Sequence, residues 1–184
     1  MKAAKLKVVP APAPPLRLDL GCGPNKREGF LGVDSIKFNG VDQVVDLRKT
    51  PLPWKTDSVD EIHCSHFLEH LHGHERVGFM NEVHRIMKPG AKLSLIVPHW
   101  SSSRAYGDVT HQWPPVVEMF FYYLSKDWRA ANAPHVGLTC DFDATWGYSM
   151  AHPWQLKNQE QQQFGLAHYR EVAQDLIATL TKKP

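Results

Sequence analysis

A short alternating stretch that ends in a two-glycine turn is the most constraining feature of this sequence. Leu16, Leu18 and Leu20 alternate with charged residues, and the apolar run ends at Gly21-Cys22-Gly23-Pro24. A strand followed by such a turn is how an open α/β sheet presents backbone to a nucleotide-like ligand at its carboxyl edge. Glycine at these positions permits backbone angles closed to other residues and carries no Cβ that would hinder the ligand. The stretch therefore predicts an α/β sheet with a ligand site where its first strand ends.

Length and composition limit the classes of protein that fit. The 184 residues are 42% hydrophobic with a formal net charge of +2, which is ordinary for one globular domain. We expect an extended, proline-rich leader at 1–15 and a single domain over 16–184. The sequence has no block of Lys and Arg residues that would indicate binding to nucleic acid. No apolar run approaches the ~20 residues that cross a bilayer, and no apolar signal-peptide region follows the N-terminal lysines. Three widely spaced cysteines predict reduced thiols and a cytoplasmic location.

The periodicity along the chain alternates between strand and helix patterns. Strands are predicted at about 16–20, 30–34, 43–47, 58–65, 92–98, 138–148 and 175–182. Helices are predicted at 67–71, 75–87, 114–124 and 157–173. The last segment fits a helical face as well as a strand, and we favour a strand antiparallel to 138–148. Between Gly23 and Asp34 the chain is too short and too broken for a crossover helix. The fold class is therefore α/β: a doubly wound, Rossmann-like, mostly parallel sheet with an antiparallel C-terminal strand and a shortened first crossover.

Acidic residues end the second and third predicted strands. Asp34 is placed to accept hydrogen bonds from both ribose hydroxyls of an adenine nucleoside. Asp46 is placed to accept from the adenine amino group while Leu47 packs on the ring. Each acid alone fits a turn cap as well, but three successive strand ends with this chemistry favour a ligand site.

The spacing of the glycines distinguishes between adenine cofactors. A dinucleotide fingerprint needs a third glycine three positions after the second, opening a helix that holds a pyrophosphate. Here that position is Lys26, and no helix fits before the second strand. A cofactor without phosphates, such as S-adenosylmethionine, is favoured over NAD.

An ordered set of motifs resembles the class I S-adenosylmethionine-dependent methyltransferases, in particular the small type 11 branch. The matching segments run from about 16 to 113: 18–23, 32–34, 45–47, 52–60, 66–71 and 82–91. The resemblance implies where each part of the cofactor binds: the methionine at the glycine turn, the ribose at Asp34, the adenine at Asp46, and the sulfonium near Ser65 and His66. The cofactor-binding residues expected on this basis are Asp19, Gly21, Cys22, Gly23, Asn25, Asp34, Ser35, Asp46, Leu47, Ser65 and His66. Asn25 and Lys26 are candidates to reach the carboxylate, because the shortened crossover removes the usual cover.

The loop after the predicted strand at 92–98 is dense in histidine, serine and aromatic residues. A small acceptor is expected here, and its substrate-side residues are Trp100, Arg104, Tyr106, Asp108 and Trp113. His99 or His111 is the predicted catalytic base, since imidazole titrates near neutral pH. Type 11 relatives carry a similar histidine-containing loop, which favours His111. Packing of the loop against the sheet is the alternative for each of these side chains.

His66-Phe-Leu-Glu-His70 also fits the inverted zincin pattern, in which His66 and His70 bind zinc and Glu69 is the general base. The methyltransferase pattern accounts for the same segment as the start of a helix, so we expect no metal. A second alternative is a regulatory module that binds S-adenosylmethionine without turnover. Trp146, Tyr148 and the aromatic segment near 120 are candidates for an apolar partner surface; the sequence does not specify an oligomeric state.

Overall fold

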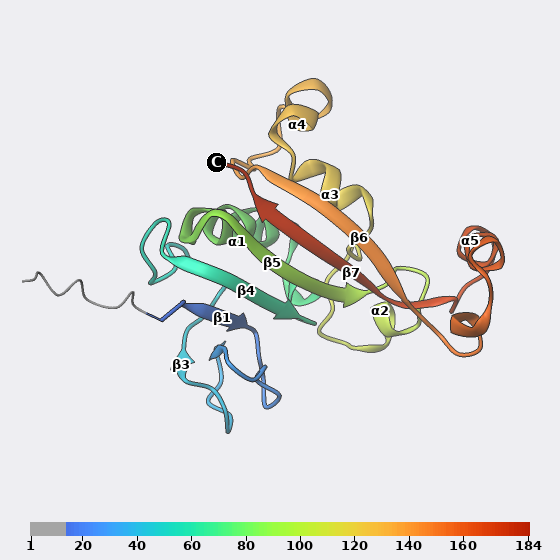
Figure 1. Cartoon of the computed structure of the whole chain (residues 1–184), viewed down its shortest axis with the longest axis horizontal. Coiled ribbons are helices and arrows are strands. Elements are labelled where there is room, and N and C mark those ends of the chain that lie inside the picture. The colour runs from blue at the N-terminus through green and yellow to red at the C-terminus, as the bar shows by residue number, and fades with distance from the viewer. Residues whose placement is uncertain (1–13) are drawn as a thin grey trace, which may run out of the picture.

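One seven-stranded sheet organises the chain. The computed structural model describes residues 14–184, so the expected leader lies outside the described residues except for its last two prolines. The strands are β1 (Arg17–Leu20), β2 (Leu31–Asp34), β3 (Gln43–Val44), β4 (Val59–Ser65), β5 (Met87–Pro98), β6 (Phe142–Met150) and β7 (Ala173–Lys182). Their order across the sheet is β3-β2-β1-β4-β5-β7-β6 (Figure 1).

The strand directions confirm the predicted fold class. β1 to β5 are mutually parallel, and β7 pairs antiparallel with both β5 and β6. The ambiguous C-terminal segment is thus a strand, as favoured. In Figure 1 the ends of β1, β4 and β5 point to the side on which α2 (Arg104–Gly107) and α5 (Gln159–His168) lie. This carboxyl edge is where open α/β sheets bind ligands.

In the described part of the chain, seven helical segments connect the strands. They are η1 (Leu68–His70), α1 (Gly73–Ile86), α2 (Arg104–Gly107), α3 (Met119–Tyr123), α4 (Lys126–Asn132), η2 (Trp154–Leu156) and α5 (Gln159–His168). The helix predicted at 67–71 is a single 3-10 turn, and the one predicted at 114–124 begins only at Met119, after two prolines. The strand predicted at 43–47 ends earlier, at Val44, because the chain forms a turn in which the backbone N–H and the guanidinium of Arg48 donate to the Asp46 carboxylate.

The apolar face of the sheet lies under α1 and α3. Leu93 and Leu95 of β5 are fully buried in one core cluster with Phe79 and Met80 of α1. On the same face, the Trp146 ring of β6 stacks on Phe121 of α3 at a centroid distance of 5.3 Å.

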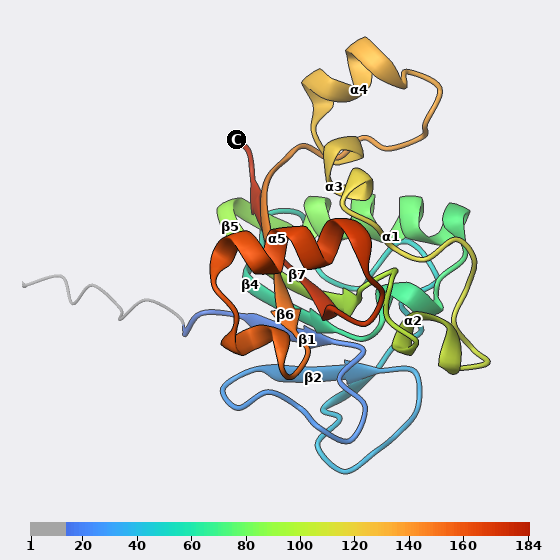
Figure 2. The ribbon, with the colours of Figure 1, turned by 90° about the vertical axis from the view of Figure 1, so that its right-hand side faces the viewer.

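The opposite face of the sheet is mostly polar, although Ile96 and Ile177 also lie on it. Ser94 of β5 pairs with Thr179 of β7, which pairs with Thr145 of β6, and these side chains are exposed or half-buried. The loops from β1 to β2 and from β2 to β3 contain no helix, and both are plain in Figure 2 around β2. The shortened first crossover is confirmed. Within residues 14–184, no helix is long and apolar enough to span a membrane.

Candidate cofactor and acceptor site

The two-glycine turn is held against the end of β2. Gly21 and Gly23 both have positive φ angles, of 72° and 52°. The Gly21 N–H donates to the Val33 carbonyl at 2.8 Å, and the Gly23 N–H donates to the Asp34 carboxylate at 2.9 Å. A Cβ on Gly21 would lie 2.6 Å from Phe67, so this position needs glycine for packing as well as for its backbone angles.

A polar cavity of about 320 Å³ opens at this turn. We call it the turn cavity; its lining residues are Asp19, Gly21, Cys22, Asn25, His63, Ser65 and His66. The structure thus brings together residues from two strand ends that the sequence predicted separately. His63 is the lining residue that sequence reasoning missed. Its signal was its position on β4, where it faces the same side of the sheet as Ser65 and pairs in register with Asp19.

Asp19 is fixed in the turn cavity by backbone. Its side chain is almost fully buried and accepts a hydrogen bond from the Arg27 N–H at 2.7 Å. Burial raises the pKa of the Asp19 carboxyl, although the Arg27 N–H opposes that shift. The Arg27 guanidinium lies 3.1 Å from the His63 ring, and burial lowers the pKa of His63. Arg27 therefore places a positive charge in contact with His63, and His63 lines this cavity.

The other predicted cofactor residues lie beyond the turn cavity. Asp34 adjoins it through its bond to Gly23, and its second oxygen accepts from the Ile36 N–H at 3.0 Å. Ser35 is exposed beside it. Asp46 forms a two-contact ion pair with Arg48, at 2.9 and 3.2 Å, and the Arg48 hydrogen bonds lower the pKa of Asp46. Leu47 is 2% exposed and belongs to the core.

The loop after β5 borders a second cavity, of about 430 Å³. We call it the loop cavity; its lining residues are His66, Glu69, His70, Pro98, Arg104, Gly107, Asp108 and His111. Three of the residues predicted on the acceptor side, Arg104, Asp108 and His111, come together here. His66 lines both cavities.

His66 has an unusual backbone and acidic neighbours. Its φ is 53°, in the left-handed region. One ring nitrogen lies 3.3 Å from the Glu69 carboxylate and the other 3.8 Å from Asp175. The neighbouring Glu69 carboxylate raises the pKa of His66. The contact to Glu69 is an ion pair without hydrogen-bond alignment, so both Glu69 oxygens are buried with no hydrogen-bond donor.

The remaining predicted residues are spread out. His99 is buried outside both cavities, where its ring lies 2.9 Å from the Ser101 hydroxyl and 3.3 Å from Glu118. Trp100 and Tyr106 line a separate open hollow with Arg170. Trp113 is 76% exposed, with its ring 6.4 Å from that of Tyr106.

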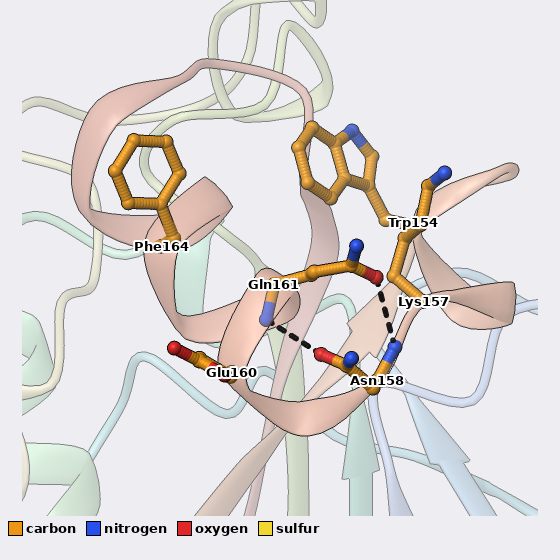
Figure 3. Close-up of a pocket in the computed structure, with 6 residues that line it drawn as sticks. All are labelled: Trp154, Lys157, Asn158, Glu160, Gln161 and Phe164. Atoms are coloured by element: carbon orange, nitrogen blue, oxygen red, sulfur yellow. Dashed lines mark hydrogen bonds between the residues drawn. The ribbon is translucent and has the colours of Figure 1, made fainter.

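A further hollow, of about 520 Å³, is lined by residues of η2, of α5 and of the turn between them (Figure 3). Its polar groups are largely used by the helix itself. The Asn158 side chain accepts from the Gln161 N–H at 2.9 Å, and the Gln161 side chain accepts from the Asn158 N–H. This reciprocal pair is a helix cap. The residues that line this hollow beside α5 line neither the turn cavity nor the loop cavity.

The H-x-x-E-H segment does not form the helix that a zincin needs. His66 precedes the 3-10 turn with a positive φ, and α1 begins only at Gly73. His66 and His70 therefore do not occupy successive turns of one helix.

Part of the chain matches a known family model. Residues 26–95 match the model of the type 11 methyltransferase family, described as a methyltransferase domain. The match includes Asp34, Asp46, Ser65 and His66 and begins just after the glycine turn. No curated protein sequence matches the chain.

Solved structures share the fold at low sequence identity. A methyltransferase dependent on S-adenosylmethionine from Archaeoglobus fulgidus has a TM-score of 0.65 and 20% identity, over 91% of this chain and 86% of that one. The complex of the Haloferax volcanii Trm112 methyltransferase activator with a methyltransferase has a TM-score of 0.59 and 14% identity, over 92% of this chain and 82% of that one. An S-adenosylmethionine-dependent methyltransferase from Methanosarcina mazei gives 0.56 and 16%, over 91% and 92%.

The strand order, the glycine turn at the carboxyl edge and the match of residues 26–95 agree with one another. Residues 26–95 therefore resemble the type 11 methyltransferase family, and the chain has the fold of the solved S-adenosylmethionine-dependent methyltransferases.

Proposed function

We propose that the protein transfers the methyl group of S-adenosylmethionine to a small polar acceptor bound in the loop cavity. The observation that carries this proposal is the position of His66, which lines both the turn cavity and the loop cavity. A methyl donor in the first and an acceptor in the second would meet at this side chain. Methyl transfer depends mainly on such positioning, because the sulfonium already activates the methyl group.

The turn cavity suits the methionine end of the cofactor. Asp19 offers a buried carboxylate to the ammonium group, and His66, next to Ser65, also lines the loop cavity. Asn25 lines the cavity and Arg27 adjoins it, so these two are our candidates for the cofactor carboxylate. The ammonium group of Lys26 is instead paired with Asp42 at 2.9 Å.

The adenosine end would lie along the exposed edge formed by β2 and β3. Asp34 keeps free lone pairs for the ribose hydroxyls beside its two backbone bonds. Ile36, 59% exposed next to Asp34, is a candidate to pack on the adenine ring in place of the buried Leu47. If Asp46 accepts from the adenine amino group, its carboxylate would bind that group and Arg48 at the same time.

The acceptor side is polar and of limited size. Arg104, Asp108 and His111 present charged and hydrogen-bonding groups to a space of about 430 Å³. In the transfer, an acceptor oxygen or nitrogen forms a bond to the methyl carbon while the carbon–sulfur bond breaks, which leaves neutral S-adenosylhomocysteine. The acceptor also loses a proton. Of the two predicted bases, His111 lies in this cavity and His99 does not.

The experiment measures binding and turnover separately. Isothermal titration should show binding of S-adenosylmethionine and S-adenosylhomocysteine, and methyl-labelled cofactor should label small hydroxyl, amine or thiol acceptors in a screen. Absence of cofactor binding would overturn the proposal.

A regulatory module without turnover remains the second candidate, and the helix-free first crossover favours it. This candidate predicts cofactor binding with no labelled acceptor. The three free cysteines support the proposed cytoplasmic location for either function.

A further inference from the structure

Three potential metal ligands converge in the loop cavity. One ligand atom from each of Glu69, His70 and His111 lies within 4.8 Å of the others. Glu69 and His70 come from η1, whereas His111 comes from the loop after β5, about forty residues later. The His70 and His111 rings meet edge to face, with centroids 4.7 Å apart.

Glu69 is the residue that the rest of the structure leaves unexplained. Its side chain is 4% exposed, and neither carboxylate oxygen receives a hydrogen bond from residues 14–184. A buried carboxylate without donors costs several kcal/mol, so such a group needs a cation or a bound partner. His66 lies 3.3 Å from one oxygen without donating a hydrogen bond, and the buried Arg76 guanidinium interacts with Glu69 through charge alone.

The hydrogen bonds of the two imidazoles determine which nitrogens are free. The Thr110 hydroxyl donates to Asp108 at 2.6 Å, so its oxygen accepts from His70 Nδ1 at 2.9 Å. His111 Nδ1 lies 3.2 Å from the Ala105 carbonyl, which can only accept. Both Nδ1 atoms therefore carry the proton, and both Nε2 atoms keep a free lone pair.

This arrangement is typical of metal-binding histidines. Such residues donate their second ring N–H to a carbonyl or to a carboxylate network, which fixes the tautomer and orients the free nitrogen. Two imidazoles and one carboxylate are a common catalytic ligand set for Zn²⁺, with the fourth position open.

We propose that Glu69, His70 and His111 form a binding site for a first-row divalent cation, Zn²⁺ in particular, with an open position toward the loop cavity. Ligand atoms around zinc lie about 3.3 Å apart, so binding requires small side-chain rotations from the present separation. The site differs from the zincin pattern, because His111 takes the place of His66. It also replaces the expectation from sequence that no metal binds.

The position of the site suggests what the metal would do. The open position faces the space assigned to the acceptor, so an acceptor with a hydroxyl or carboxylate oxygen would bind there as a ligand. This part rests on the proposed function. His111 would then serve as a ligand, and the metal would make the acceptor oxygen easier to deprotonate.

Titration of the metal-free protein with Zn²⁺, followed by calorimetry, tests the site. We expect one equivalent to bind, and Co²⁺ as a probe to give the visible absorption of a low-coordinate site. His111→Ala and Glu69→Gln should each weaken Zn²⁺ binding at least tenfold. His74→Ala is the matched control, since His74 is exposed on α1 and is not one of the three ligands; its Zn²⁺ affinity should be unchanged.

Thermal unfolding of each variant identifies any loss that comes from misfolding, and Glu69→Gln keeps the shape of the side chain if His111→Ala does not fold. Equal Zn²⁺ affinity in wild type and folded Glu69→Gln, or no binding by wild type, would overturn the metal site. S-adenosylhomocysteine binding is measured in parallel. Normal cofactor binding and turnover without Zn²⁺ binding would reject this site alone, whereas Zn²⁺ binding without cofactor binding would reject the proposed function alone.

Discussion

The Asp34 carboxylate accepts a hydrogen bond from the Gly23 N–H at 2.9 Å, and this bond joins the end of β2 to the glycine turn after β1. The acid that the sequence assigned to the ribose is therefore also part of the scaffold of the turn. Its other oxygen holds the Ile36 N–H. Changes at Asp34 should act on the ligand and on the turn together.

Replacement of Asp34 by alanine should weaken S-adenosylhomocysteine binding at least tenfold. The ribose would lose charge-assisted hydrogen bonds, each contributing about 1.5–3 kcal/mol. Calorimetry measures the affinity, and circular dichroism shows whether the fold persists. Asp143→Ala, which removes an exposed acid from β6, is the control and should leave the affinity unchanged. Unchanged affinity in Asp34→Ala would mean that this acid does not bind the ribose.

Gly21→Ala should destabilise the protein and weaken cofactor binding. The new Cβ would overlap Phe67 at 2.6 Å, and the φ of 72° is strained for alanine. Together these should cost about 2–4 kcal/mol of unfolding free energy. Gly29→Ala is a close control, since it has a φ of 79° in the same loop but no atom within 4 Å of its Cβ. It should lose only about 1 kcal/mol. Denaturant unfolding measures both, and equal losses would show that contact with Phe67 does not matter.

Stability should fall in acid partly through Glu82. Its carboxylate accepts from two nitrogens of Arg85 and from the Leu52 N–H, and the Arg85 hydrogen bonds lower the pKa of Glu82 below its usual 4.5. Because the folded-state pKa is the lower one, this stabilisation is complete above about pH 4.5 and is lost as the pH falls through the folded-state value.

Glu82→Gln should therefore lower the unfolding free energy by about 1–2 kcal/mol at pH 7 and flatten its pH dependence below pH 4.5. Denaturant melts across pH 3–7 measure this slope. Glu160→Gln, at an exposed acid of α5, serves for comparison and should keep the wild-type slope. A Glu82→Gln slope as steep as that of wild type would contradict the expectation.

Arg76 should prove essential for the loop cavity. Its buried guanidinium donates to the carbonyls of Leu68, Gln112 and Pro114, so it ties η1 to the loop after His111. Arg76→Met would leave the Gln112 and Pro114 carbonyls without this donor and should cost about 3 kcal/mol, measured by chemical denaturation. Lys88→Met, which removes an exposed ion pair with Asp60, should cost at most about 1 kcal/mol. Similar losses in the two variants would argue against the linking role.

The parts of the fold that follow from local periodicity were predictable from sequence. The glycine turn and the missing first helix rest on patterns within a few residues, and the structure confirms them. The final segment fitted a helix as well as a strand, and its pairing with β5 and β6 confirms the favoured strand. The short helices α2 and α4 were not predicted, because four and seven residues show too little periodicity. The 3-10 turn of η1 depends on tertiary contacts with Arg76 rather than on helix propensity.

The residues of the candidate site were also only partly predictable from sequence. The turn cavity residues were accessible because strand ends of a parallel sheet meet at one edge. His63 escaped notice because only the pairing of β1 with β4 places it beside Asp19. The convergence of Glu69 with His111 depends on how the loop after β5 folds back, and neither residue's surroundings can be read from its neighbours in sequence.

The helix-free connection between β1 and β2 has a kinetic consequence. Within residues 14–184 the connection between β1 and β2 provides no helix to cover the turn cavity, so we expect the proposed cofactor to leave without an opening step of this connection. Fast release of S-adenosylhomocysteine would then limit product inhibition. Stopped-flow displacement should accordingly find a dissociation rate that hardly varies with solvent viscosity, as expected where no lid moves.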